Sequence, residues 1–155
     1  MMRSEIDLEA GTWIISKERT KNGKAHHIDL SPEAVSLISG GHDGFYHSCA
    51  LVFSTTGYSA PSGFSKAKAR LDKRMANMLG ERFQPWRTHD LRRTAASGMA
   101  GLGYQPHVIE RVLNHVSGVQ GGLVGVYQRH QYVEERRAAT LAWAGHIGEL
   151  VKQGR

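Results

Sequence analysis

The sequence has few of the residues that build disulfide-rich or metal-binding proteins. Among its 155 residues there is one cysteine, Cys49, so no disulfide can form within the chain and a reducing compartment is expected. The stretch that contains His42, His47 and Cys49 lacks the tight Cys-x-x-Cys pair typical of zinc sites. We therefore expect no bound metal and no other cofactor, and we interpret Cys49 as a small core residue.

Long apolar runs are also missing. Residues 1–10 include Arg3, Glu5, Asp7 and Glu9 and carry no apolar stretch, unlike a secretory signal peptide. No segment approaches the roughly 20 apolar residues that a membrane-spanning helix requires. From these two absences we expect a cytoplasmic protein without a membrane partner.

Acidic residues are outnumbered by basic ones. The chain has 20 lysines and arginines against 14 aspartates and glutamates, which gives a formal net charge of +6. Such an excess is compatible with a polyanionic partner such as nucleic acid, although many soluble proteins are equally basic. With 40% hydrophobic residues, the chain is sufficient for one domain with its own core and too short for two comfortable ones.

Two runs of β-forming residues predict a β-hairpin near the start of the chain. The first run covers residues 12–16 and the second covers residues 24–30. Asn22 and Gly23 stand between them, and Asn-Gly is the strongest short hairpin signal because both residues tolerate positive φ. We therefore predict that the two runs pair with Lys21 at the tip of the hairpin.

Helix signals dominate the rest of the sequence. Ser31 followed by Pro32 is typical of a helix start, and Gly40 of its end. Apolar residues spaced by three or four predict further helices. The predicted helices are 32–40, 64–79 with a basic face, 88–101 with Thr88 as N-cap, 106–113, 123–129 and 133–151; a short buried strand is predicted at 50–53. The fold class is α+β and mostly α, with a small N-terminal sheet.

Four features with possible chemistry follow one another in a fixed order. Each alone has an ordinary structural interpretation: a histidine and an arginine three residues apart often share a helix face, and a lysine is common at exposed turns. A histidine after a helix is favoured by the helix dipole. The functional hypothesis comes from the ordered set, which is Lys21, His89-Asp90-Leu91-Arg92, Leu113-Asn114-His115 and Tyr127.

This ordered set resembles the tyrosine recombinases, and phage and genomic-island integrases in particular. The family pattern is a histidine-x-x-arginine box, a leucine-glycine-histidine-like box in which Asn114 here replaces the glycine, and a tyrosine some ten residues on. Residues 19–23 resemble the family's catalytic-lysine hairpin, and residues 132–143 resemble the integrase C-terminus. The resemblance extends from about residue 5 to 150. Tyr132 is a rival to Tyr127, but we interpret it as a packing residue at the head of the last helix.

The resemblance implies an integrase-like catalytic domain that cleaves and rejoins double-stranded DNA by transesterification without metal. Tyr127 would attack phosphorus and form a 3′-phosphotyrosyl link that preserves the bond energy for rejoining. Arg92 would stabilise charge on the non-bridging oxygens, because a guanidinium donates in a fixed fork. We also expect a homo-oligomer assembled on DNA.

The remaining site residues follow from the same resemblance. His89 would assist proton movement at the tyrosine or bind the phosphate, and His115 would donate a hydrogen bond to a phosphate oxygen. Lys21 would protonate the leaving 5′ oxygen. Further contacts with DNA are expected from three basic residues near these boxes: Arg87, Arg93 and Lys24.

The family's first catalytic arginine, which normally begins an arginine-x-x-glutamate box, is not clearly present. Counting three back from Glu5 gives Met2, and Arg3 is a poor substitute. A better alignment matches residues 4–13 to the family segment just after that box. Losing one phosphate-binding cation commonly costs on the order of a hundredfold or more in rate. We therefore expect residues 1–155 to be a single, N-terminally incomplete catalytic domain that is inactive in this form unless another cation substitutes. The alternative is a non-catalytic DNA-binding integrase remnant.

Overall fold

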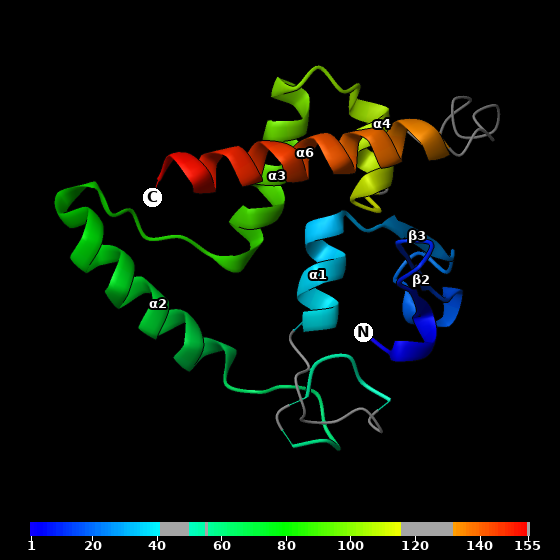
Figure 1. Ribbon diagram of the computed structural model, residues 1–155, viewed down its shortest axis with the longest axis horizontal. Helices are drawn as coiled ribbons and strands as arrows, with labels where there is room; N and C mark the ends of the chain where they lie inside the picture. Colours follow the sequence, from blue (N-terminus) through cyan, green and yellow to red (C-terminus); the bar gives the residue numbers. More distant parts are fainter. Residues whose placement is uncertain (41–49, 55, 116–131, 155) are drawn as a thin grey trace.

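A small antiparallel sheet and a set of helices make up the computed structural model, which describes residues 1–40, 50–54, 56–115 and 132–154 (Figure 1). The expected α+β, mostly helical class is confirmed. The sheet has the order β1-β2-β3. Its strands are β1 (Ile6–Asp7), β2 (Thr12–Ile15) and β3 (His26–Asp29); the helices are α1 (Pro32–Gly40), α2 (Phe64–Leu79), α3 (Thr88–Gly101), α4 (Pro106–Val112) and α6 (Val133–Gln153).

The predicted hairpin is confirmed, but its turn differs from the expected one. β2 and β3 pair antiparallel, with Thr12 opposite Asp29 and Ile15 opposite His26. Between them, residues 17–19 form a short 3-10 helix, and Gly23 has a positive φ of 65° whereas Asn22 does not. The connection is therefore longer than a two-residue Asn-Gly turn. Lys21 is exposed within it.

The strand predicted at residues 50–53 is wrong. Only an isolated bridge between Met2 and Leu51 forms, framed by backbone hydrogen bonds from Arg3 N–H to the Ala50 carbonyl at 2.9 Å and from Val52 N–H to the Met1 carbonyl at 3.2 Å. The partner segment turns into a 3-10 helix at Arg3, so the pairing cannot extend. Val52 is nevertheless buried, as a strand residue would be.

Two helix starts show how local hydrogen bonds set the boundaries. The Ser31 hydroxyl accepts the Ala34 amide at 3.2 Å, which confirms Ser31 as the residue before α1. At α3 the predicted Thr88 N-cap is wrong, and Arg87 holds that position. The cause is Asp90, whose carboxylate accepts the Arg87 amide at 2.8 Å and so moves the helix start one residue earlier.

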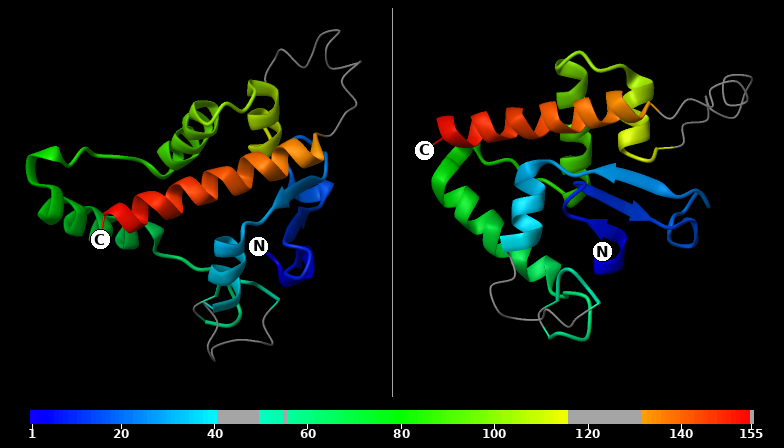
Figure 2. Two further views of the ribbon diagram at one scale, coloured as in Figure 1. Left: turned by 45° about the horizontal axis from the view of Figure 1, so that its top comes forward. Right: turned by 45° about the vertical axis from the view of Figure 1, so that its right-hand side comes forward.

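The core of the molecule lies where α3, α4 and α6 meet. Met99, Val108, Ile109 and Ala139 form one buried cluster, and α6 lies across α3 and α4 in both views of Figure 2. The α3–α6 contact is close enough that a Cβ added to Gly98 would lie 2.1 Å from the Trp143 ring. We call α3, α4 and α6 the three-helix unit.

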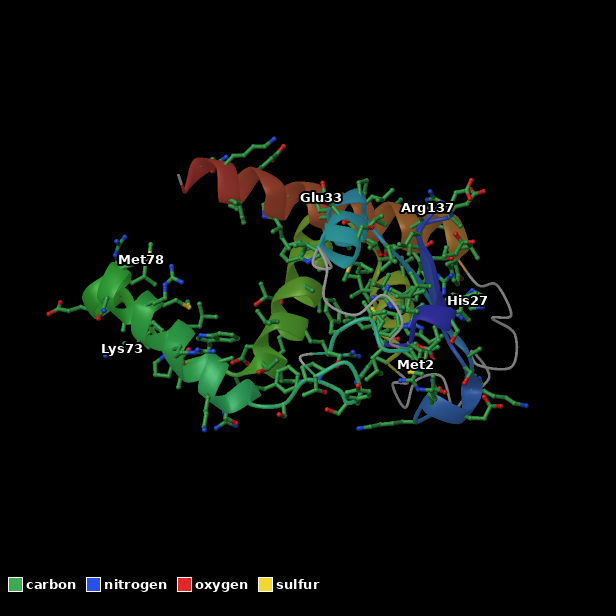
Figure 3. The ribbon with its side chains drawn as sticks, turned by 60° about the horizontal axis from the view of Figure 1, so that its bottom comes forward. Met2, His27, Glu33, Lys73, Met78 and Arg137 are labelled. Carbon is green, nitrogen blue, oxygen red and sulfur yellow. The ribbon has the colours of Figure 1, made fainter. Side chains whose placement is uncertain are left out.

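Helix α2 lies apart from the three-helix unit (Figures 1 and 3). It ends, as predicted, at Gly80, whose φ is 55°, but none of its residues is buried. Phe64 is 71% and Met78 80% exposed. Lys68 links α2 to the following segment, because its Nζ lies 4.5 Å from the centroid of the Trp86 ring. The same Nζ lies 2.6 Å from Asp72 Oδ2 within α2. Among the residues that the structure describes, no helix is long and apolar enough to cross a membrane.

Candidate active site

The chain turns sharply where α4 ends, and the second sequence box lies in this turn. The amides of Leu113, Asn114 and His115 bond back to carbonyls of α4 at 2.8 to 3.2 Å. Asn114 has a positive φ of 49°, a left-handed conformation that asparagine tolerates better than most residues. The turn leaves carbonyl oxygens at the end of α4 open to side chains from other elements.

Arg92 of α3 uses one of these carbonyls. Its Nη2 donates a hydrogen bond to the Leu113 carbonyl oxygen at 2.5 Å, and the side chain is partly buried. In the described part of the chain no other side-chain hydrogen bond or ion pair of Arg92 is found. A guanidinium has five N–H donors, so most of them stay available to an anion. His89 is exposed three residues earlier, on the same side of α3.

The hairpin reaches the same turn from the sheet. Asn22 Nδ2 donates a hydrogen bond to Asn114 Oδ1 at 2.7 Å, across 92 residues of sequence. Within the hairpin loop, the Thr20 hydroxyl donates to the Lys24 carbonyl at 2.7 Å, and the Lys24 amide donates to Asn22 Oδ1 at 3.2 Å. These contacts place the loop that carries Lys21 next to the Leu113-Asn114-His115 box.

His26 is a site residue that the sequence interpretation missed. It is half-buried on β3, and its ring N–H donates to the Val112 carbonyl. Burial first, and then the positive charges of Arg136, His27 and Arg92, hold the pKa of His26 below its usual value, against the opposing effect of that hydrogen bond. The neighbouring pair His26-His27 gave no signal for this position, because only the strand register decides which histidine faces inward.

The other predicted residues that the structure describes lie at exposed positions. His115 is exposed directly after Asn114, and Lys21, Lys24 and Arg87 are exposed as well. Arg93 is also exposed, and its Nη1 lies 3.6 Å from Asp90 Oδ1, which partly neutralises it. Exposure is what contact with a DNA backbone requires.

Tyr127, the predicted helix at 123–129 and Cys49 lie outside the described residues. The rival Tyr132 stands before α6 with φ of 48°. Its ring centroid is 4.6 Å from that of His107 and 5.3 Å from the guanidinium carbon of Arg111. These contacts support the interpretation of Tyr132 as a packing residue.

Glu5, near the start of the described chain, is bonded to the sheet and to the loop that follows β2. Its carboxylate accepts hydrogen bonds from the Met2 amide at 3.0 Å and the Trp13 indole at 3.2 Å, and it pairs with Arg19. Partial burial, the largest influence, acts to raise the pKa of Glu5, but these bonds together lower it below its usual value. Across the described ranges, no group of three or more His, Cys, Asp or Glu side chains is arranged to hold a metal ion.

Comparisons with known proteins identify the family of this chain. Residues 1–132 match the phage integrase family, and the chain therefore belongs to that family. Among curated proteins, the prophage integrase IntA of Escherichia coli (strain K12) is 29% identical over 154 residues, which is 96% of this chain and 33% of the relative. The chain thus spans about a third of the length of that relative. No solved structure matches.

Proposed function

We propose that this chain carries out site-specific DNA recombination by cleaving and rejoining strands through a covalent 3′-phosphotyrosyl link at Tyr127. The observation that carries the proposal is the convergence at the end of α4: Arg92 bonds to Leu113, and the lysine hairpin bonds to Asn114 through Asn22. Three of the family-like boxes, distant in sequence, are thereby brought to one turn. Membership of the phage integrase family supports the same reaction class.

The proposed chemistry balances without an external reactant. The Tyr127 oxygen forms a bond to phosphorus while the bond from phosphorus to the 5′ oxygen breaks, and the reverse step rejoins a strand. His89 assists removal of the tyrosine proton, and Lys21 delivers a proton to the leaving oxygen. Arg92 and His115 stabilise the charge that develops on the non-bridging oxygens.

Double-stranded DNA is the proposed substrate and partner. The exposed Arg87, Arg93 and Lys24 are proposed to contact phosphates, which position the protein without reading sequence. We further propose that residues 1–155 act as one catalytic domain and that recombination is carried out by several copies assembled on DNA. The tail from Tyr132 onward, which resembles the integrase C-terminus, is the proposed contact between copies.

A phosphorothiolate-bearing DNA substrate tests the proposal directly. Duplexes tiled across host integration-site DNA, each with a phosphorothiolate at one position, should trap a covalent protein–DNA adduct that shifts on a denaturing gel. Tyr127→Phe should abolish the adduct, and Tyr132→Phe is the matched control that should retain it. An adduct that persists in Tyr127→Phe would exclude Tyr127 as the nucleophile.

A second candidate function is DNA binding without cleavage. It is favoured by the sequence of residues 1–13, in which the family's first catalytic arginine is not clearly present and Arg3 is a poor substitute for it. In this case the same duplexes should be retained in a salt-dependent manner, with no adduct on any of them. A clear adduct would rule this candidate out.

A further inference from the structure

A buried arginine without a counter-charge lies beside the candidate site. Arg136 of α6 is 8% exposed, and its Nε has no hydrogen-bond partner among the described residues. None of the ion pairs found in the described ranges includes it. Burying an unpaired charge is unfavourable, so a buried guanidinium normally contacts an anion.

Arg136 and Arg92 approach the site from the same core. Arg92 precedes Ala95, Ala96 and Met99 on α3, and Arg136 precedes Ala139 by one turn of α6. These apolar residues pack together in the core of the three-helix unit. The two arginines therefore continue the packed faces of α3 and α6 beyond the apolar cluster, rather than facing solvent on opposite sides.

His26 lies near both guanidinium groups. The charges of Arg136 and Arg92 both contribute to the lowered pKa of His26, after burial and with His27 as the other nearby cation. His26 bonds to the Val112 carbonyl, and Arg92 bonds to the next carbonyl, that of Leu113. Three basic side chains from β3, α3 and α6 thus gather at the end of α4 with no carboxylate paired to either arginine in the described residues.

We propose that Arg136 supplies a second guanidinium to the DNA phosphate held by Arg92, with His26 between them as a hydrogen-bonding group. This inference rests on the proposed function and deepens it, because it assigns a further cation to the phosphate-binding site of Arg92. A phosphate with two non-bridging oxygens offers a partner to each guanidinium. It also relieves the repulsion between two like charges that share a partly buried site.

The test measures DNA affinity as a function of salt for the full chain, in the Tyr127→Phe background so that no cleavage occurs. Arg136→Gln should reduce the slope of log affinity against log salt by about 0.9, the value for one lost phosphate contact. Arg137→Gln is the matched control, since Arg137 is the exposed neighbour on the same helix (Figure 3). It should leave the slope unchanged. Equal slopes in all three proteins would overturn the inference.

Two further variants of Arg136 separate its charge from its hydrogen-bonding geometry, and its role in DNA binding from a role in folding. Arg136→Lys keeps the charge but not the fork, so it should retain the salt slope and still slow adduct formation by Tyr127 on the order of 10²-fold or more. Arg136→Met keeps an apolar stem of similar length; if it raises the thermal stability and leaves the salt slope intact, the arginine is structural and the inference fails. A reduced slope in Arg136→Gln with no adduct in the unmodified chain would instead support the inference and refute cleavage.

Discussion

The three-helix unit and the hairpin loop carry two different parts of the candidate site and are held in two different ways. Arg92 and Arg136 extend from helices whose side chains form the buried cluster of Met99, Val108, Ile109 and Ala139. Lys21 lies in a loop for which one side-chain hydrogen bond, from Asn22 to Asn114, reaches the helices. The groups proposed to bind a phosphate in fixed geometry thus lie on packed elements, and the lysine proposed to protonate the leaving oxygen lies on a loop with fewer contacts to the helices in the described residues.

Removing side-chain volume from the core of the three-helix unit should give the largest change in the free energy of unfolding. It tests whether this unit is more tightly packed than α2. Met99 is 1% exposed, so Met99→Ala should destabilise the fold by about 2–5 kcal/mol. Met78→Ala on α2, where Met78 is 80% exposed, should change stability by less than about 0.5 kcal/mol. Urea unfolding of both variants measures the difference. Similar losses in both would show that α2 is packed as tightly as the unit.

The close α3–α6 contact gives the next largest effect. Gly98→Ala should cost about 1–3 kcal/mol, because the new methyl group would meet the Trp143 ring. Gly145→Ala on α6 meets nothing within 4 Å and should stabilise by about 0.5–1 kcal/mol. Thermal melts distinguish the two, and combining Gly98→Ala with Trp143→Leu should restore part of the loss. A stabilising Gly98→Ala would mean that the helices are further apart.

Breaking the hydrogen bond between the hairpin loop and the helices should change the free energy of unfolding only slightly and should slow adduct formation. Asn22→Ala removes the bond to Asn114 and should cost about 0.5–1.5 kcal/mol. It should also slow adduct formation by Tyr127, since Lys21 loses its position, while Asn77→Ala on the exposed surface of α2 should change neither. Unfolding curves and adduct time courses give both values. An unchanged adduct rate would show that the link does not position the lysine.

The smallest expected effect is a pH dependence from His26. Its folded-state pKa is lowered, so the unfolded chain takes up the proton first as pH falls below the ordinary histidine value of about 6.5. Stability therefore rises with pH in this window and is lost as pH falls through it. His26→Gln should reduce the loss between pH 7 and 5 measured by urea unfolding, whereas His27→Gln should not. An identical pH dependence in His26→Gln would show that the lowered pKa of His26 makes no contribution to stability.

Local signals predicted most of the fold. The paired β runs, the Ser31-Pro32 helix start and the three-to-four spacing of apolar residues depend on neighbours in sequence, and they located the hairpin and the described helices. The predicted strand at 50–53 is wrong because pairing there depends on a distant segment, which forms only the Met2–Leu51 bridge. The predicted Thr88 N-cap is wrong because the Asp90 carboxylate bonds to the Arg87 amide. β1 is two residues long, and a pattern of that length carries no signal.

Motifs predicted one part of the candidate site, and packing alone marks the other. The two boxes predicted His89, Arg92 and His115; in the structure Arg92 bonds to the Leu113 carbonyl at the end of α4, two residues before His115. His26 and Arg136 look like an ordinary strand residue and an ordinary helix charge. Only the strand register and the burial of α6 distinguish them from exposed neighbours such as His27 and Arg137.

The bond between Asn22 and Asn114 has a consequence for the order of folding. It closes a loop of 92 residues, and contacts of such separation form late because the chain must first pay the entropy of closing the loop. The lysine hairpin and the arginine helices therefore come together only when nearly the whole chain has folded. A chain still emerging from the ribosome, or one partly unfolded, lacks the assembled set of groups, so the candidate site is complete only after the last step of folding.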